Sequence, residues 1–363
     1  MTYNLRQRHH LKVRLDLSER AFFFRLKGEI ILTKIIAFGV TQEEAEVVKK
    51  WSTDQNIHVD MTPEYLTPET VHLAKGYDGI TNMQVSNIVE PVYTKLKELG
   101  IRVIGQRSAG YEMYDLKAAS QNDIIITNVP SYSPESIAEF SVFAAMRLIR
   151  NSDLIDQRVE AQNFTWEPII RSRPIKNLKI AVIGVGRIGS RVAKIYKHGF
   201  GAEVVAYDIV ERDEFRKHVD YQPDLLTAVK DADVITIHMP LTEDNYHQFN
   251  RGLFNQMKTG ATLINAARGK IVKTQDLVEA IDSGQIKNAA LDVYEGEGPF
   301  IPQNWEGKEI QDDVFIQILN HPNIYYTPHI AYYTDIAVQN LVEGGLNSAL
   351  EVIQTGTAQN RVN

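Results

Sequence analysis

The stretch from Lys179 to Asp208 constrains the fold of this chain more than any other part of the sequence. It begins with the apolar, β-branched run 179–183, continues through the glycine turn Gly184-Val-Gly-Arg-Ile-Gly189 and a helical run, and ends with a second apolar run at Asp208. A strand, a tight glycine turn, a helix and a second strand in this order form one βαβ unit. The stretch therefore predicts an α/β fold with a parallel sheet.

Each glycine of this turn has a separate physical task. Gly184 allows the tight turn, Gly186 lets the backbone approach a pyrophosphate, and Gly189 lets the helix pack closely against the strand. The helix N-terminus offers unpaired N–H groups and a partial positive charge to phosphates. Asp208 ends the second strand, where a carboxylate accepts both ribose hydroxyls and repels a 2′-phosphate. This combination predicts that the chain binds a dinucleotide, and NAD rather than NADP.

The length and composition are those of an ordinary globular protein. A chain of 363 residues with 44% hydrophobic and 23% charged residues allows two domains, each with its own core. No apolar run approaches the roughly 20 residues that a membrane span needs. The chain has no cysteine, which excludes a disulfide framework, a thiolate zinc site and a thiol nucleophile. We therefore expect no membrane segment, and a reducing compartment fits this composition.

The first 32 residues differ in charge from the rest of the chain. They contain seven Lys and Arg against three Asp and Glu, whereas the whole chain has a formal charge of −7. The remainder is therefore strongly acidic, which argues against nucleic acid as the main partner. The segment does not resemble a secretory signal, because its apolar stretch is short and lacks a cleavage pattern. We expect residues 1–32 to be a non-core extension, and hypothesise that natural translation starts near Leu32. A presequence or a nucleic-acid-binding arm is the alternative.

Alternating strand and helix patterns continue on both sides of the βαβ unit. Before it, strand-like runs at 33–40, 101–105 and 124–127 alternate with helical patterns at 42–51, from Thr67 onward and at 88–99. This predicts a second, smaller parallel-sheet domain. A long helix from about Pro134 to Arg150, capped by Ser131 or Ser133, is expected to carry the chain between the domains. We therefore expect two doubly wound parallel-sheet domains with a cleft between them. Residues 33–133 plus 330–363 would bind the substrate, and residues 134–329 would bind NAD.

Three chemically interesting residues follow later strands at the points where those strands end. Arg268 follows the run 261–265, Glu297 follows 289–293, and His329 follows 324–327. In an open α/β sheet, ligands bind outside the carboxyl ends of the strands. Singly, each residue also has an ordinary explanation, as a loop stabiliser, a solvated acid or a satisfied histidine. Together they match what the reduction of a 2-keto acid requires.

Each of the three suits one task in that reaction. The guanidinium of Arg268 can bind a carboxylate through two parallel hydrogen bonds. His329 can donate a proton to the carbonyl oxygen, because the pKa of histidine lies near working pH. Glu297, if within reach, favours the charged imidazolium. A metal hydrolase is not expected, because the chain lacks cysteine and an HExxH cluster, and the serine-hydrolase motif GxSxG is also absent. We expect no metal site.

At these residues the chain resembles the D-isomer-specific 2-hydroxyacid dehydrogenases, and most closely their bacterial D-lactate dehydrogenase group. The resemblance covers about Thr33 to Asn363. It is carried by the glycine turn and by the motifs Asn265-Ala-Ala-Arg-Gly269, Leu291-Asp-Val-Tyr-Glu-Gly-Glu297 and Thr327-Pro-His-Ile-Ala331. The motifs Asn128-Val-Pro-Ser-Tyr-Ser133 and Trp305-Glu-Gly-Lys308 narrow it to the branch that acts on lactate and hydroxyisocaproate.

The resemblance implies a role for each site residue. His329 would be the acid/base, Glu297 its partner and Arg268 the substrate cation. NADH would deliver a hydride to C2 of pyruvate to give D-lactate. The small-residue loop 107–111 is an ordinary βα turn on spacing alone, but the resemblance makes Ala109 and Gly110 a carboxylate cradle and places Tyr132 in the substrate pocket. The further cofactor contacts would come from Arg187, Ile188, Met239, Pro240, Asn245, Ala266, Ala267, Arg268 and Asp292. The family is also expected to be homodimeric and cytoplasmic.

Two departures from the family pattern leave questions open. The link 196–201 looks one residue longer than usual. Tyr332 stands where many lactate enzymes carry phenylalanine, so a reductase of bulkier, branched 2-keto acids is an alternative. An NAD-sensing binding protein, like the C-terminal-binding corepressors, is a second alternative from another functional class. Outside the extension 1–32, we recognise no tail or partner motif in the sequence that favours it.

Overall fold

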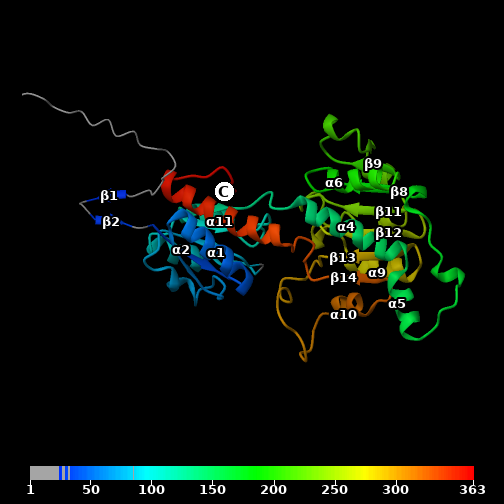
Figure 1. The fold of residues 1–363 in the computed structure, drawn as a ribbon, viewed down its shortest axis with the longest axis horizontal. Coiled ribbons are helices and arrows are strands. Elements are labelled where there is room, and N and C mark those ends of the chain that lie inside the picture. The colour runs from blue at the N-terminus through cyan, green and yellow to red at the C-terminus, as the bar shows by residue number, and fades with distance from the viewer. Residues whose placement is uncertain (1–23, 27–28, 32, 85) are drawn as a thin grey trace, which may run out of the picture.

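The computed structural model describes residues 24–26, 29–31, 33–84 and 86–363 (Figure 1). These residues form two lobes, each built around one parallel sheet. Most of the predicted N-terminal extension, residues 1–32, lies outside the described residues. Its described part is the antiparallel pair β1 (Phe24–Leu26) and β2 (Glu29–Ile31), which forms a sheet separate from the other two.

The larger lobe contains a seven-stranded sheet in the order β10-β9-β8-β11-β12-β13-β14, with all neighbours parallel. The chain therefore proceeds outward from β8 in both directions, which places the point of reversal between β8 and β11. Ligands bind at such a point in doubly wound sheets. The strands are β8 (Lys179–Ile183), β9 (Glu203–Tyr207), β10 (Asp220–Tyr221), β11 (Val234–Ile237), β12 (Ala261–Asn265), β13 (Ile286–Leu291) and β14 (Ile324–Tyr326).

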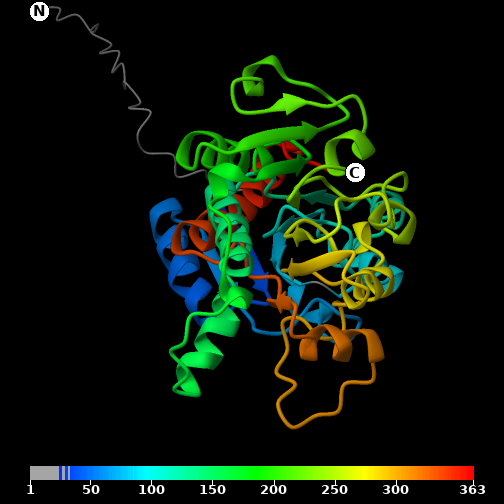
Figure 2. The ribbon, with the colours of Figure 1, turned by 90° about the vertical axis from the view of Figure 1, so that its right-hand side faces the viewer.

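Helices cover both faces of this sheet. Alternate residues of β8 point to opposite faces, so that Ala181 and Ile183 belong to one hydrophobic core, whereas Ile180 and Val182 belong to another. Figure 2 shows α4 and α5 on one side of the sheet and α9 and α10 on the other. The helices of this lobe are α4 (Pro134–Ile149), α5 (Ser152–Glu160), α6 (Gly189–Lys194), α7 (Leu225–Val229), α8 (Arg251–Phe254), α9 (Thr274–Asp282) and α10 (Asp313–Asn320).

The smaller lobe contains a five-stranded parallel sheet in the order β4-β3-β5-β6-β7. The C-terminal helix α11 (Asp335–Thr355) returns to this lobe and packs on the sheet beside α1 (Figure 1). The packing is close, because a Cβ added to Gly105 would lie 2.4 Å from the Gly345 carbonyl oxygen. The other elements are β3 (Lys34–Phe38), α1 (Gln42–Gln55), β4 (His58–Met61), β5 (Gly79–Asn82), α2 (Glu90–Glu98), β6 (Val103–Gln106), α3 (Leu116–Gln121) and β7 (Ile125–Thr127).

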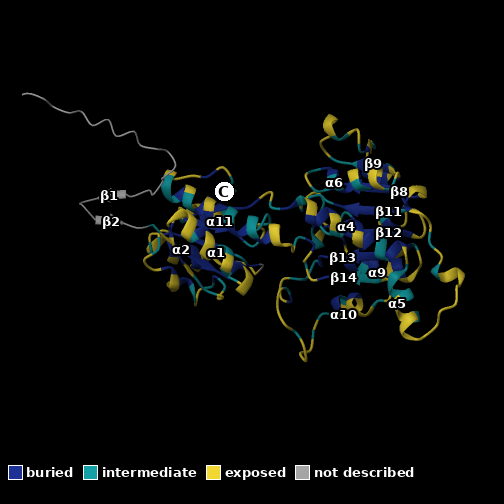
Figure 3. Ribbon diagram, viewed as in Figure 1, coloured by how far each residue is buried: buried dark blue, intermediate teal, exposed yellow. Residues whose placement is uncertain are grey.

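These two sheets confirm the α/β, doubly wound parallel-sheet prediction, and burial is concentrated in their strands (Figure 3). The prediction of a helix that begins at Thr67 was wrong, because only the 3-10 turn Val71–Ala74 forms there. The Thr70 hydroxyl donates to the carbonyl oxygen of Tyr65 and accepts from the N–H of Thr67. Such local bonds compete with a helix. None of the described helices combines the length and apolar character that crossing a bilayer requires.

Two smaller expectations also have structural outcomes. Ser133 occupies the N-cap position of α4, but its side chain makes no capping bond and instead contacts the Ser136 hydroxyl at 2.6 Å. Ser133 is therefore the N-cap residue, as expected, but it makes no side-chain capping bond. The long link 196–201 begins within a π-helix, Ile195–Gly199, that continues α6. A π-turn is the usual way in which a helix accommodates one extra residue.

Candidate active site

The glycine turn between β8 and α6 has the geometry that its sequence predicts. Gly184 has φ +90°, and a Cβ added there would lie 2.7 Å from the backbone of His238 and Met239. A Cβ added to Gly189 would lie 1.9 Å from the Gly184 carbonyl oxygen, so the helix can approach the turn only without a side chain. Around Gly186, by contrast, a Cβ would meet nothing within 4 Å. The open space beside Gly186 therefore fits a phosphate group that approaches the backbone.

Asp208 lies directly beside this turn at the end of β9. Its Oδ2 accepts a hydrogen bond from the N–H of Val185 at 2.6 Å, and its Oδ1 accepts from the N–H of Val210 at 2.9 Å. A carboxylate has about four acceptor positions, so two remain for the hydroxyls of a ribose. Nη1 of Arg212 lies 3.9 Å from Oδ2. The residues of the turn and Asp208 together fit a dinucleotide.

The remaining predicted cofactor residues surround this turn in loops. Asn245 stabilises the loop after β11, because its Oδ1 accepts from the N–H of Thr242 at 2.8 Å and its Nδ2 donates to the Pro240 carbonyl at 2.7 Å. Arg187 reaches toward the smaller lobe and donates to the Pro130 carbonyl at 3.2 Å. The others lie in the same strand-end loops, with Ile188 at the start of α6, Met239 beside Gly184, and Ala266 and Ala267 directly after β12.

His329 and Glu297 form a hydrogen-bonded pair. Nδ1 of His329 lies 2.8 Å from Oε1 of Glu297, and Nδ1 is the donor because a carboxylate only accepts. The second oxygen of Glu297 accepts from the N–H of Tyr294 at 3.0 Å, which fixes its orientation. The His329 side chain is 33% exposed, and its Nε2 makes no hydrogen bond to the described residues. That nitrogen is therefore available to a ligand.

The electrostatic surroundings favour the charged form of His329. Burial lowers the pKa of the imidazole, and so does the charge of Arg268. The hydrogen bond to Glu297 and the negative charges of Glu297 and Asp292 outweigh these effects, so that the pKa of His329 lies above its ordinary value. A raised pKa keeps a larger fraction of His329 protonated near neutral pH.

Asp292 is buried beneath the loop that carries His329. Its Oδ1 accepts from the Thr327 hydroxyl at 2.6 Å and from the N–H of Ile330 at 2.9 Å, and its Oδ2 accepts from the N–H of Ala331 at 2.9 Å. Burial raises the pKa of this carboxyl group. The loop also includes His329 at φ +57°, a conformation that a non-glycine residue rarely adopts. Asp292 therefore holds the loop, while its contact with the cofactor stays a prediction.

Arg268 lies in a tightly packed loop after β12. Asn265 stabilises this loop, because its Nδ2 donates to the Arg268 carbonyl at 3.0 Å and its Oδ1 accepts from the N–H of Ala267 at 3.1 Å. A Cβ added to Gly269 would lie 2.2 Å from the Tyr294 backbone, so this loop packs directly on the segment that leads to Glu297. The guanidinium donates from Nη1 to the Ala267 carbonyl at 2.7 Å and from Nε to Glu112 at 2.7 Å.

The loop containing Ala109 and Gly110 meets Arg268 from the smaller lobe. A Cβ added to Gly110 would lie 2.9 Å from Nη2 of Arg268. Asn128 donates to the Ala109 carbonyl at 2.7 Å, and the Ser108 hydroxyl donates to the Gly110 carbonyl at 2.6 Å. Within the described residues, the N–H groups of Ala109 and Gly110 donate to no acceptor. Two free N–H groups beside a guanidinium form a favourable environment for a carboxylate.

Tyr132 and Tyr332 pack against each other, and each comes from a segment that connects the lobes. Their ring centroids are 6.0 Å apart with the planes at 86°. Asn340 of α11 donates to the Tyr132 carbonyl. Burial raises the pKa of Tyr132 to about 12, and burial likewise raises the pKa of Tyr332, so both phenols are neutral at physiological pH.

Three residues of this arrangement were not predicted from the sequence, namely Glu112, Asn128 and Asn265. The two asparagines lie within motifs, where an amide between a strand and a turn indicates a loop-stabilising role. Glu112 directly follows the small-residue loop 107–111, but only the fold brings it to Arg268. Among the described residues, no group of three or more His, Asp and Glu side chains is arranged to hold a metal ion.

Comparisons with known proteins agree with this geometry. Residues 142–331 match the family model described as D-isomer specific 2-hydroxyacid dehydrogenase, NAD binding domain. The D-lactate dehydrogenase of Streptococcus pyogenes serotype M1 is 51% identical over 330 residues, which are 91% of this chain and 100% of that protein.

Two solved structures extend the similarity to the fold. A D-lactate dehydrogenase from Treponema pallidum superposes with a TM-score of 0.84 at 35% identity, over 91% of this chain and 100% of that one. A D-2-hydroxyisocaproate dehydrogenase superposes with a TM-score of 0.83 at 33% identity, over 91% of this chain and 99% of that one. On its sequence, its fold and the match of its larger lobe, this chain belongs to the D-isomer specific 2-hydroxyacid dehydrogenase family.

Proposed function

We propose that this protein is an NAD-dependent D-lactate dehydrogenase, which transfers a hydride reversibly between NADH and pyruvate. The observation that carries the proposal is the His329–Glu297 pair beside Arg268, at the strand ends of a sheet whose glycine turn fits a dinucleotide. The identity of 51% with a D-lactate dehydrogenase supports lactate as the product. NADH, when bound, supplies the hydride.

The residues of the chain then perform the other tasks of the reaction. Arg268 and the N–H groups of Ala109 and Gly110 bind the carboxylate of pyruvate and so orient its carbonyl group. Nε2 of His329 donates a proton to the carbonyl oxygen as the alcohol forms, and takes a proton from the alcohol in the reverse direction. Glu297 stabilises the imidazolium that donates the proton in reduction and that forms when His329 takes the proton in the reverse direction. The proposed roles of these residues rest on the geometry and charges described above.

Cofactor selection in this proposal rests on Asp208. Its carboxylate is held by the N–H groups of Val185 and Val210 and retains acceptor positions for two ribose hydroxyls. A 2′-phosphate placed there would meet a negative charge, so NADH is preferred to NADPH. Met239, Pro240 and Asn245 are proposed to line the adenosine side, and Arg187 and Ile188 the pyrophosphate.

A reductase of bulkier 2-keto acids is the second candidate. Tyr332 packs on Tyr132, where we expect the substrate side chain to bind. Many lactate enzymes of the family pattern carry phenylalanine at the position of Tyr332. The superposition with a D-2-hydroxyisocaproate dehydrogenase is close, with a TM-score of 0.83. The chain is 33% identical to that protein but 51% identical to the streptococcal D-lactate dehydrogenase. This difference in identity favours pyruvate as the substrate.

One assay tests the proposal and its alternative. NADH oxidation is measured with pyruvate and, in parallel, with 2-ketoisocaproate, and the product is analysed on a chiral column. We expect D-lactate, a higher kcat/KM for pyruvate, and weak activity with NADPH. A higher kcat/KM for 2-ketoisocaproate would establish the second candidate. NADH binding without turnover of either acid would contradict the enzyme and favour an NAD-sensing protein. His329→Gln serves as the inactive control.

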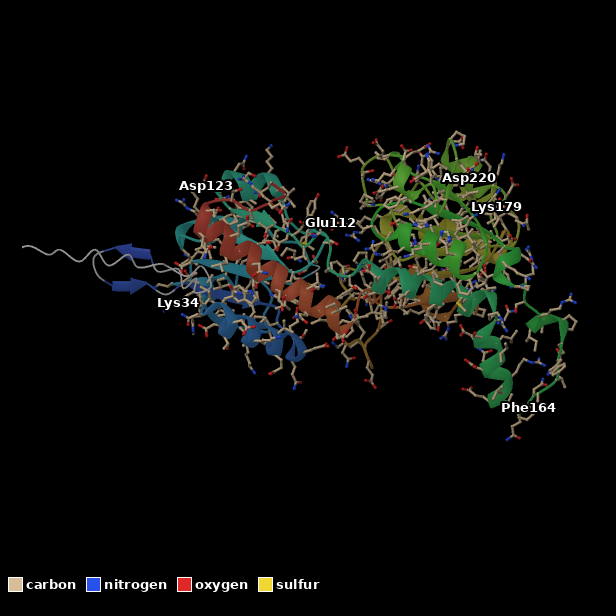
Figure 4. All side chains as sticks on the ribbon, turned by 45° about the horizontal axis from the view of Figure 1, so that its top comes forward. Lys34, Glu112, Asp123, Phe164, Lys179 and Asp220 are labelled. Carbon is tan, nitrogen blue, oxygen red and sulfur yellow. The ribbon has the colours of Figure 1, made fainter. Side chains whose placement is uncertain are left out.

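We further propose that the protein is a cytoplasmic homodimer, as the family resemblance implies. The supporting surface lies at the end of the larger lobe, where the segment after α5 extends outward (Figure 4). This segment contains Phe164, Trp166 and Ile169, which are 71%, 96% and 64% exposed. Large apolar side chains gathered on one exposed segment commonly mark a protein–protein contact.

A further inference from the structure

Glu112 and Arg268 form an ion pair that joins the two lobes. Oε1 of Glu112 lies 2.7 Å from Nε of Arg268, although the two residues are 156 positions apart in the sequence. Among the ion pairs of the described residues, it is the one that connects residues 33–127 to residues 179–326. Figure 4 labels Glu112 on the side of the smaller lobe that faces the larger one.

The carboxylate of Glu112 lies beside the proposed binding place for the substrate carboxylate. A Cβ added to Gly110 would lie 2.6 Å from Oε2 of Glu112 and 2.9 Å from Nη2 of Arg268. Nη1 of Arg268 is already bonded to the Ala267 carbonyl. The edge formed by Nε and Nη2 is one of the two guanidinium edges that can bind a carboxylate with two parallel hydrogen bonds, and Glu112 occupies its Nε.

The ion pair is formed but readily broken. Burial raises the pKa of Glu112, but the charge and hydrogen bond of Arg268 outweigh this effect and lower the pKa below its ordinary value. The side chains of Arg268 and Glu112 are 31% and 48% exposed. Solvent screening makes such a pair weak. A second carboxylate with better geometry can therefore replace Glu112 on the guanidinium.

We propose that Glu112 is an internal competitor that occupies Arg268 in the free enzyme and is displaced by the carboxylate of the substrate. This inference rests on the proposed function and names a residue that determines specificity. A ligand with a carboxylate replaces Glu112 on the guanidinium of Arg268. A neutral carbonyl compound cannot form this ion pair, so Arg268 stays paired with Glu112. The pair therefore lowers the affinity for 2-keto acids and leaves the affinity for neutral ketones and aldehydes unchanged, so it narrows the preference for acids over neutral carbonyl compounds.

Glu112→Gln tests this competition. The binding of oxamate, a non-reacting analogue of pyruvate, is measured calorimetrically at saturating NADH and constant ionic strength, and KM and kcat for pyruvate are measured in parallel. We expect the Kd of oxamate and the KM of pyruvate to fall roughly two- to fivefold, the range that an exposed ion pair allows. We expect kcat to change little, because Glu112 is absent from the proposed reacting groups.

Two comparisons separate competition from other effects. Glu64→Gln removes the same charge from an exposed position of the same lobe that makes no ion pair with the described residues, and should leave both constants unchanged. Pyruvamide, which lacks the carboxylate, should not bind more tightly to Glu112→Gln. An unchanged or raised Kd for oxamate would overturn the inference, since a raised value would mean that Glu112 supports Arg268 in the complex. A wild-type enzyme that fails to reduce pyruvate would instead refute the proposed function.

Discussion

At the scale of single residues, charge matters as much as position in this site. Glu297 contacts His329 through one oxygen and the backbone of Tyr294 through the other. A glutamine could keep this shape, but it could not supply the negative charge that raises the pKa of His329. The two contributions of Glu297, orientation and charge, can therefore be separated by a single substitution.

Glu297→Gln should shift the pH dependence of pyruvate reduction. In the proposed mechanism, reduction requires protonated His329, so activity should be lost as pH rises through the pKa of that residue. Removing the negative charge lowers this pKa, and the upper limb of kcat/KM should move to lower pH while activity is partly retained in acid. His329→Gln should lose roughly 10²-fold or more at every pH, because the proton donor is gone.

The measurement is kcat/KM for pyruvate against pH in the wild type and both variants. Glu306 is an exposed acid in the segment between β13 and α10, which also contains Glu297. Glu306→Gln therefore serves as the control for the loss of one negative charge. An upper limb that stays in place in Glu297→Gln would refute the proposed role of the pair.

Sequence could predict some of these residues and not others. The nearness of His329, Glu297 and Arg268 was predictable because each follows a strand, and parallel strands bring their carboxyl ends to one edge; their catalytic roles stay a prediction. Glu112 was not, because its partner is 156 positions away and an acid in a surface loop has no periodic pattern. The structural role of Asp292 was also hidden, since its hydrogen bonds depend on how the loop 327–331 folds back over β13.

At the scale of elements, the pattern of apolar runs predicted the strands well. Strands buried on both faces read as continuous apolar runs, as in 179–183 and 261–265. Helices with fewer buried residues were harder to predict. No side chain of α5 is buried, so its sequence carries no apolar stripe. The 3-10 turn Val71–Ala74 is short because threonine side chains bond the preceding backbone.

The glycine turn offers a matched pair of substitutions within one element. Gly189→Ala places a Cβ 1.9 Å from the Gly184 carbonyl oxygen, so the helix must move away from the strand. We expect a loss of stability of roughly 1–3 kcal/mol or more, as for other overpacked sites. Gly186→Ala meets no protein atom within 4 Å, and should fold normally but bind NADH more weakly because the methyl group enters the phosphate space.

Thermal unfolding without cofactor and NADH titration by fluorescence distinguish the two effects. A normal melting temperature for Gly189→Ala would mean that the turn relaxes more easily than its geometry indicates. Unchanged NADH affinity in Gly186→Ala would mean that the pyrophosphate does not approach this glycine.

At the scale of the whole molecule, both lobes contribute residues to the candidate site. The larger lobe holds the glycine turn, Asp208 and the His329–Glu297 pair, and the smaller lobe holds the loop of Ala109 and Gly110. The apolar segment after α5 belongs to neither sheet, and its side chains Phe164, Trp166 and Ile169 are exposed. Its proposed role is to contact a second copy of the chain.

Replacing Phe164 and Trp166 together with serine should weaken the proposed dimer. Removing two large apolar side chains reduces the area that a partner can bury. We expect a monomer or a concentration-dependent equilibrium in light scattering after gel filtration, with the wild type at twice the chain mass. Ile209→Ser alters another highly exposed apolar residue and should leave the mass unchanged. A wild-type protein that is monomeric at all concentrations would refute the homodimer.

The return of α11 to the smaller lobe has a consequence for how new specificities can arise in this family. Because the chain leaves the smaller lobe near Pro134 and re-enters it near Ile330, two junctions delimit the whole larger lobe. Recombination at those junctions could join a different smaller lobe to the intact larger lobe, whose residues 142–331 match the NAD binding domain of the family. Such an exchange would keep Asp208, Arg268 and His329 together and replace the loop of Ala109 and Gly110, so each incoming lobe would have to fit Arg268, as Glu112 does here.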